Sequence, residues 1–211
     1  MDIVEQLVKV ALLGATWVLY VMFALSVLAV AAMVERWWFY RGNARQAAAF
    51  TPALLTVLQD GDEHDVADVL ARGRGVEAEV LADAFAFREG GPEAFADAID
   101  SALGARRGRL DRSTTLLGTI GNNAPFVGLF GTVLGVIEAF SYLGAGDASA
   151  MGNVMSGIAE ALVATAVGIF VAIPSVVGFN LAQKKSGEIE TSVGVLAKRL
   201  SAWLRVQARR S

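Results

Sequence analysis

The sequence has no cysteine and only one histidine, His64. Without thiols the chain has no disulfides, no thiolate metal ligands and no cysteine nucleophile, and one imidazole by itself does not make a histidine metal site. The sequence also has no nucleophile–base set and no phosphate-binding glycine loop. We therefore expect no catalytic residues, no cofactor and no bound metal.

Charged residues are scarce as well. They make up 18% of the 211 residues, whereas a typical soluble domain has about a quarter, and apolar residues make up 55%. The charges gather in some segments and are missing from long runs. This segregation is typical of an integral membrane protein and argues against a soluble enzyme.

Three apolar runs are long enough to cross a membrane. Crossing a hydrocarbon core of about 30 Å takes roughly 20 helical residues. Residues 10–34 contain no charge, residues 116–143 contain one acid, Glu138, and residues 158–183 contain one acid, Glu160. The first run is about twice as long as the apolar core of a cleavable signal peptide, so we expect it to be retained. The sequence thus predicts three transmembrane helices.

Basic residues near the ends of these runs predict their direction, because Lys and Arg accumulate on the cytoplasmic side. They follow the first run, precede the second and follow the third: Arg36, Arg41, Arg45, Arg106, Arg107, Arg109, Arg112, Lys184 and Lys185. The opposite side has one basic residue, Lys9. Residues 1–9 and 144–157 are therefore expected in the periplasm, and residues 35–112 and 184–211 in the cytoplasm. The same rule explains the Arg106–Arg112 cluster without nucleic-acid binding.

The two cytoplasmic segments have a helical pattern. Apolar residues of the C-terminal segment share one helical face: Ile189, Val193, Leu196, Leu200 and Leu204. Residues 35–112 show helical spacing interrupted by glycines and Pro92, with no strand-like alternation. We predict an all-α fold, a three-span transmembrane protein whose long helices extend into a cytoplasmic helical subdomain.

Small residues recur at steps of three and four in the second and third runs. The second run has Gly121, Ala124, Gly128, Gly131, Gly135 and Ala139, and the third has Gly157, Ala161, Ala164, Gly168, Ala172 and Ser175. Membrane helices pack closely along such stripes because small side chains let the backbones approach. The stripes are explained by packing of the three spans within one chain, and two separate stripes also leave a surface for neighbouring subunits.

Three polar residues within the runs, Thr132, Glu160 and Thr165, are candidates for an ion path. An ionisable group at membrane depth costs about 2.5–3.5 kcal/mol on insertion scales, so it usually faces protein or a water-filled path. Glu160 is such a group, unless it lies at the outer interface or caps a helix. Glu138 is more simply interfacial. Thr132 and Thr165 place hydroxyls on small-residue helices, although a membrane threonine usually bonds its own preceding turn.

Two motifs now become informative. Residues 125–140 read PFVGLFGTVLGVIEAF, and residues 157–180 read GIAEALVATAVGIFVAIPSVVGFN. They resemble the ExbB/TolQ family and, more distantly, the flagellar stator subunit MotA. The resemblance is close over spans two and three, whereas span one and the loop after it match only in outline.

The resemblance implies a subunit of a motor of the bacterial inner membrane that is driven by the proton motive force. In this family five copies surround a pore that holds the helices of a dimeric single-span partner resembling ExbD or TolR, whose aspartate cycles a proton. By motif position, Thr132, Glu160 and Thr165 fall on residues of the family's ion path. The role of Glu138 stays open, because it lies in a more variable stretch.

Two functions from different classes follow as hypotheses. The first is an ion-conducting subunit that energises outer-membrane transport, Tol-type envelope maintenance or gliding; the polar residues favour protons and leave sodium open. The second is a membrane scaffold or assembly protein that uses the same small-residue packing without conducting ions. The sequence leaves open which envelope process is driven.

Overall fold

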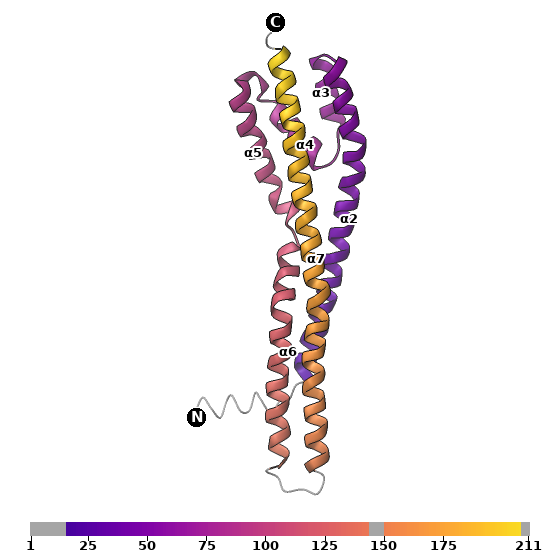
Figure 1. The fold of residues 1–211 in the computed structure, drawn as a ribbon, viewed down its shortest axis with the longest axis vertical. Coiled ribbons are helices and arrows are strands. Elements are labelled where there is room, and N and C mark those ends of the chain that lie inside the picture. The colour runs from indigo at the N-terminus through magenta and orange to yellow at the C-terminus, as the bar shows by residue number, and fades with distance from the viewer. Residues whose placement is uncertain (1–15, 144–149, 208–211) are drawn as a thin grey trace. The chain divides into compact units, whose positions relative to one another are not determined.

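The computed structural model describes residues 16–143 and 150–207, and every regular element in these residues is a helix (Figure 1). The order is α2 (Thr16–Asp60), α3 (Glu63–Arg72), α4 (Val76–Phe85), the 3₁₀ turn η1 (Arg88–Gly90), α5 (Gly91–Leu110), α6 (Thr114–Leu143) and α7 (Ala150–Gln207). The predicted all-α fold is confirmed.

Three of these helices have the length and apolar composition to cross a membrane: α2, α6 and α7. Helix α2 has 45 residues and α7 has 58. At about 1.5 Å per residue they are about 68 Å and 87 Å long, well beyond a hydrocarbon core of about 30 Å. Both spans therefore continue as polar helices outside the membrane, as the sequence predicts.

The third membrane helix, α7, begins earlier in the sequence than the hydropathy indicates. Residues 144–157 are predicted as a periplasmic loop, but α7 is already helical from Ala150. Hydropathy detects where a segment becomes apolar, whereas helical hydrogen bonding continues past that point into polar surroundings. Residues 144–149, and residues 10–15 of the first predicted span, lie outside the described residues.

The chain divides into two compact units. Unit 1 comprises residues up to Val34 together with Ser113–Asn180, and unit 2 comprises Glu35–Arg112 together with Leu181–Ser211. The divisions fall where the apolar runs meet charged sequence. Unit 1 therefore contains the apolar parts of α2, α6 and α7, and unit 2 contains the amphipathic helices.

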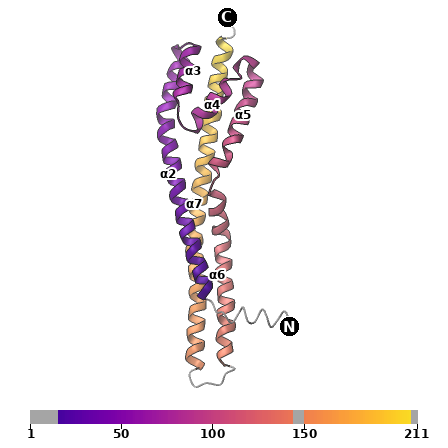
Figure 2. The same ribbon diagram turned by 180° about the vertical axis from the view of Figure 1, so that it is seen from behind.

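In unit 1 the two small-residue stripes face each other. A Cβ atom built on Gly128 would lie 2.8 Å from the carbonyl oxygen of Ala164, and one on Gly168 would lie 2.7 Å from that of Ala124. The backbones of α6 and α7 are thus in direct contact, and the two helices lie side by side in both Figure 1 and Figure 2. Packing within one chain thus accounts for the contacts of both stripes.

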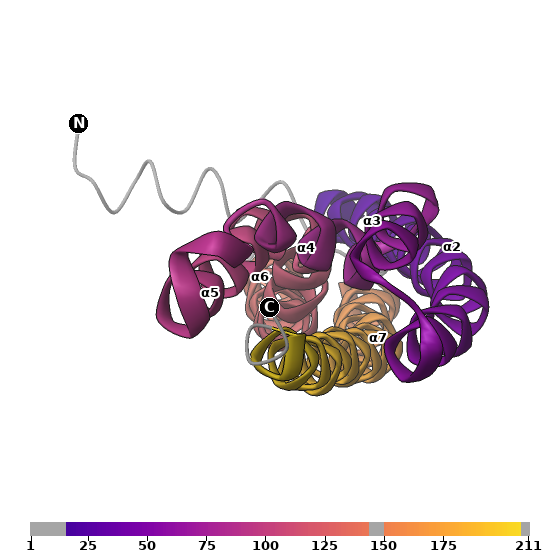
Figure 3. The ribbon, with the colours of Figure 1, turned by 90° about the horizontal axis from the view of Figure 1, so that it is seen from above.

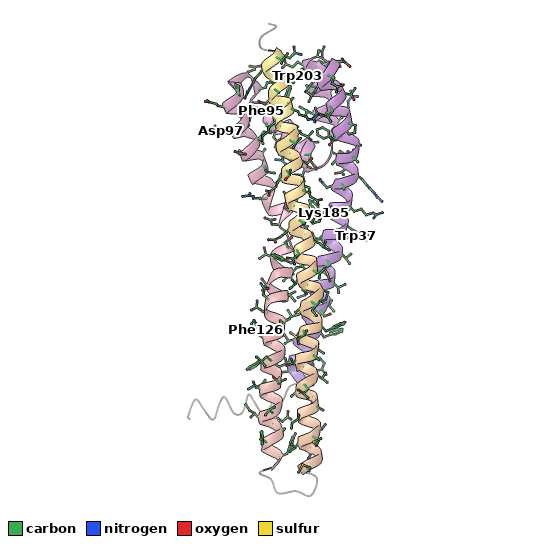
Figure 4. All side chains as sticks on the ribbon, viewed as in Figure 1. Trp37, Phe95, Asp97, Phe126, Lys185 and Trp203 are labelled. Atoms are coloured by element: carbon green, nitrogen blue, oxygen red, sulfur yellow. The ribbon has the colours of Figure 1, made fainter. Side chains whose placement is uncertain are left out.

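The opposite faces of α6 and α7 are apolar and exposed. Phe126 projects from the side of α6 away from α7 (Figure 4) and is 68% exposed. Large side chains on these faces include Leu129, Val133, Phe140, Leu162, Phe170 and Ile173. Apolar surface of this extent is normal where lipid or a neighbouring membrane helix covers it.

In unit 2, α4 lies between α3 and α5 (Figure 3). A continuous core joins these helices to the polar parts of α2 and α7, and Leu54, Leu81 and Leu200 are fully buried in it. Local signals define the ends of the short helices. Asp62 and Asp65 form a reciprocal capping box at the start of α3. Gly75, at φ 97°, allows the turn into α4 that a residue with a side chain rarely adopts.

Two buried polar side chains of α2 cap neighbouring helices. The Arg36 guanidinium donates to the carbonyl oxygens of Arg109 and Leu110 at 3.1 Å each, at the end of α5. Asn43 accepts from the backbone N–H of Val76 at 2.8 Å, at the start of α4, and donates to the buried carboxylate of Glu77 at 2.9 Å. Free backbone groups at helix ends need partners of this kind.

Candidate ion path

Glu160 lies on α7 in unit 1 and is half-buried. Its carboxylate accepts a hydrogen bond of 2.6 Å from the Thr16 hydroxyl on α2. Because α7 begins at Ala150, ten residues earlier, Glu160 lies in the third turn of the helix and does not cap its start. Helix capping, one of the two structural explanations for this acid, is therefore wrong.

Thr165 presents an unpaired hydroxyl. Its Oγ1 is buried, and no hydrogen-bond partner for it exists among the described residues. Its backbone lies against α6, because a Cβ on Gly128 would be 3.0 Å from the Thr165 Cα. Buried hydroxyls are usually paired, so an unpaired one needs an explanation. The chain itself therefore leaves the hydrogen bonding of Thr165 incomplete among the described residues.

Thr132 behaves in the ordinary way of a membrane threonine. Its Oγ1 donates to the carbonyl oxygen of Leu129, in its own preceding turn, at 2.6 Å. The oxygen keeps acceptor capacity, because a hydroxyl has two lone pairs and one proton. Thr132 and Thr165 therefore differ: the first is already satisfied as a donor, and the second is not.

Thr132 and Thr165 lie on the same side of the α6–α7 contact. Eleven residues make about three helical turns, so Thr132 shares a face of α6 with Gly121, and Thr165 shares a face of α7 with Val176. Gly121 and Val176 touch, since a Cβ on Gly121 would lie 2.6 Å from a Val176 methyl group. The antiparallel contacts of Gly128 with Thr165 and of Gly131 with Ala164 place the two threonines at similar depth.

Glu160 lies on the other side of this contact, towards α2. It is 18 residues, or about five full turns, before Gly178, which packs against Met33 of α2. Its hydrogen bond to Thr16 agrees with this direction. The structure thus places Thr132 and Thr165 on one side of the α6–α7 contact and Glu160 on the other. Glu160 and Thr165 are five residues apart, which is about 140° around a helix, so the sequence already indicates that they face different directions.

Glu138 lies near the C-terminal end of α6, also towards Glu160. Its carboxylate accepts from the Tyr142 hydroxyl at 3.1 Å, and Glu160 is within electrostatic reach of that hydroxyl. One partner from its own helix is enough to explain Glu138 structurally. Among the described residues there is also no group of three or more acids, histidines or cysteines that would hold a metal ion.

Thr16 is a partner of Glu160 that the sequence does not predict. It lies in the first apolar run, where an isolated threonine has no periodic or motif signal. Only its position in space, across from a residue 144 positions later, shows its connection to Glu160.

The sequence of residues 72–194 matches the family described as the MotA/TolQ/ExbB proton channel family, a match that covers more than half of the chain. The chain belongs to this family. The match contains α6 and most of α7, with Thr132, Glu160 and Thr165, and leaves out the apolar part of α2 with Thr16. The resemblance inferred from the two motifs is confirmed, and three apolar helices make this member of the proton channel family a multi-pass protein of the inner membrane.

Three relatives are similar to this chain over part of its length. The Tol-Pal system protein TolQ of Pseudomonas aeruginosa is 42% identical over 88 residues, which are 42% of this chain and 38% of the relative. TolQ of Haemophilus influenzae is 35% identical over 111 residues, which are 53% of this chain and 49% of the relative. The biopolymer transport protein ExbB of Xanthomonas campestris pv. campestris is 40% identical over 92 residues, 44% of this chain and 36% of the relative. The chain thus matches at most about half the length of these relatives.

Proposed function

We propose that this chain is the proton-conducting subunit of an inner-membrane motor that energises an envelope process such as outer-membrane transport, Tol-type envelope maintenance or gliding. Membership of the proton channel family supports the proposal. The observation that carries it furthest is the Thr165 hydroxyl. It is buried at membrane depth, has no hydrogen-bond partner among residues 16–143 and 150–207, and shares one side of the α6–α7 contact with Thr132.

In the proposed assembly, several copies of the chain, five by the family resemblance, surround a pore. The pore holds the single-span helices of a dimeric ExbD- or TolR-like partner, and each helix carries an acidic residue. The names of the TolQ and ExbB relatives support this choice of partner. The N-terminus would be periplasmic and the C-terminus cytoplasmic, in agreement with the basic residues that follow the first and third runs.

The proposed mechanism is proton transfer without covalent catalysis, so we propose no enzymatic role. The Thr165 hydroxyl donates to the ionised partner acid, and Thr132 accepts from the same acid when it is protonated. Glu160, held by Thr16, contributes negative charge beside the path. A proton that crosses the potential gains about 2.3 kcal/mol per 100 mV, which is enough to bias the motion of the partner in one direction.

The experiment is a proton-flux measurement on proteoliposomes that contain the chain and its single-span partner, with a potassium diffusion potential as driving force. Thr165→Val keeps the shape and removes the hydroxyl. A hydrogen bond to a charged group is worth about 1.5–3 kcal/mol, so we expect flux to fall about tenfold or more. Thr165→Ser restores the hydroxyl and is expected to keep most of the flux.

Thr119→Val is the matched control, because the Thr119 hydroxyl bonds the carbonyl oxygen of Thr115 in its own helix. It is expected to leave flux unchanged. Subunit composition is measured for each variant by native mass spectrometry. If Thr165→Val assembles normally and conducts at the full rate, the assignment of Thr165 is wrong.

The alternative function is a scaffold that does not conduct ions, and the packed α6–α7 contact is compatible with it. The same preparation separates the two. A scaffold would show no potential-driven flux above that of liposomes with the partner alone, and its Thr165→Val variant would differ in neither flux nor assembly.

A further inference from the structure

A small hollow on α2 lies directly after the first apolar run. It has a volume of about 290 Å³ and is lined by Trp37, Trp38, Arg41, Gly42 and Arg45. These residues, which we call the Trp–Arg hollow, occupy little more than two turns of one helix in unit 2. The apolar run ends at Val34, so the hollow lies at the depth where a membrane helix leaves the hydrocarbon core.

The three arginines after this run have different environments. Arg36 is 4% exposed and is used inside unit 2 to cap α5. Arg41 and Arg45 are exposed, and neither makes an ion pair with a carboxylate in residues 16–143 and 150–207. The Arg41 guanidinium lies over the Trp37 ring, 5.2 Å from its centroid. Two positive charges are thus available to an external anion.

The two tryptophans expose apolar surface that nothing in the described chain covers. Trp37, labelled in Figure 4, is 56% exposed, and Trp38 is 68% exposed. Tryptophan is enriched at membrane–water interfaces, where its ring has apolar and polar neighbours. Exposed rings beside unpaired guanidinium groups are suited to the boundary between acyl chains and headgroups, where the rings contact apolar atoms and the charges contact polar ones. In bulk water the rings would be exposed to solvent.

Gly42 keeps the hollow open. A Cβ at this position would meet no atom within 4 Å, so no close packing requires glycine here. Glycine is unfavourable inside a helix, and alanine would be better on helical propensity alone. Because Gly42 has no side chain, space remains between the side chains of Arg41, which precedes it, and Arg45, three residues later.

We propose that the Trp–Arg hollow binds the phosphodiester headgroup of an anionic phospholipid. The guanidinium groups of Arg41 and Arg45 donate charge-assisted hydrogen bonds to the phosphate oxygens. The rings of Trp37 and Trp38 pack against the glycerol and the first acyl carbons. A lipid satisfies both features of the hollow, whereas a free phosphate leaves the rings uncovered. The site is independent of ion conduction.

The test uses tryptophan fluorescence in vesicles. The full chain carries Trp17→Phe and Trp203→Phe, so that Trp37 and Trp38 are the only reporters, because the sequence has four tryptophans. Quenching is compared between vesicles with brominated phosphatidylglycerol and vesicles with brominated phosphatidylcholine, each in a background of unlabelled phosphatidylcholine. We expect stronger quenching by phosphatidylglycerol at low mole fraction. Addition of 10-fold excess inorganic phosphate is expected to leave it unchanged.

Three variants separate specific binding from general attraction. Arg41→Gln with Arg45→Gln removes two charges. Each basic residue near an anionic surface contributes about 1 kcal/mol, or about fivefold in affinity, so the preference for phosphatidylglycerol is expected to fall about 25-fold. Gly42→Leu fills the hollow and keeps both charges, and we expect it to abolish the preference as well. The control is Lys198→Gln with Arg199→Gln, which removes two exposed charges from α7, about 20 Å along the helix beyond Lys185, and is expected to have no effect.

Each other outcome overturns the proposal. Equal quenching by the two lipids means that the tryptophans lie in an unselective interface. A preference that survives Gly42→Leu means general surface attraction without a headgroup site. Loss of the preference on addition of inorganic phosphate means a site for free anions. Circular dichroism of each variant shows that the helices are retained, and none of these results depends on whether the chain conducts protons.

Discussion

Gly168→Ala is the most direct test of the α6–α7 contact. A Cβ at this position would lie 2.7 Å from the carbonyl oxygen of Ala124 and 3.1 Å from the Gly128 Cα. Ordinary contact begins at about 3.4 Å, so the helices would have to separate by about 0.7 Å at this point. Both opposing atoms belong to the backbone, which cannot move aside as a flexible side chain can.

The size of the effect follows from two opposing terms. Alanine in place of glycine gains up to about 1 kcal/mol of helix propensity. Overpacking typically costs about 1–3 kcal/mol, and a radial gap of about 0.5–1 Å removes a quarter to a half of the dispersion energy of the separated atoms. The contact also involves the neighbouring glycines of the stripe, so we expect a net loss of about 1–2 kcal/mol.

Thermal unfolding of the purified chain in detergent, followed by tryptophan fluorescence, measures this loss. For a protein of this size, about 1 kcal/mol corresponds to about 2–4 °C, so Tm is expected to fall by about 2–8 °C. The control is Gly187→Ala, also within α7, where a Cβ meets no atom within 4 Å. It keeps the propensity gain without the clash and should unfold at the same or a higher temperature. An unchanged or raised Tm for Gly168→Ala would refute the close contact of the two backbones.

Two further predictions concern polar groups of unit 2. Asn43→Leu removes the hydrogen-bond donor to the Glu77 carboxylate, which is 3% exposed, and also the cap of α4. We expect the free energy of unfolding to fall by about 2–3 kcal/mol in the same assay. A loss below about 0.5 kcal/mol would contradict the cap. The hydrogen bond from Lys185 and the nearby positive charge of Lys184 lower the pKa of Glu188 below its ordinary value of 4.5. Any stability from this exposed pair is complete above about pH 4.5 and is lost as the pH falls through the lowered pKa. NMR titration checks this, and Lys185→Gln is expected to return the pKa of Glu188 towards its ordinary value, whereas an unchanged pKa would contradict the assigned cause.

The arginines after the first run show how far a charge pattern predicts position. Their number and spacing predict the cytoplasmic side of the span, and that reasoning treats Arg36, Arg41 and Arg45 alike. In the structure Arg36 caps α5, whereas Arg41 and Arg45 remain exposed. A topogenic signal depends only on charge along the chain, but a cap depends on which carbonyl groups the fold brings near.

The candidate ion path was only partly predictable. The motifs identify Thr132, Glu160 and Thr165 by resemblance, and helical geometry indicates that Glu160 and Thr165 face different directions. The sequence contains no information on which hydroxyl bonds its own turn. That difference between Thr132 and Thr165 depends on side-chain rotamers and on the depth of each residue in the α6–α7 contact.

The sequence by itself determined the all-α class, the three long apolar helices and the family, because helical periodicity, uncharged length and local motifs are all properties of neighbouring residues. Only the tertiary structure decided that the two glycine stripes pack against each other, and that Glu160 is held by Thr16 on α2. Each of these contacts joins residues far apart in the chain. Periodicity shows which residues share a helix face, but the partner of that face depends on how the helices pack.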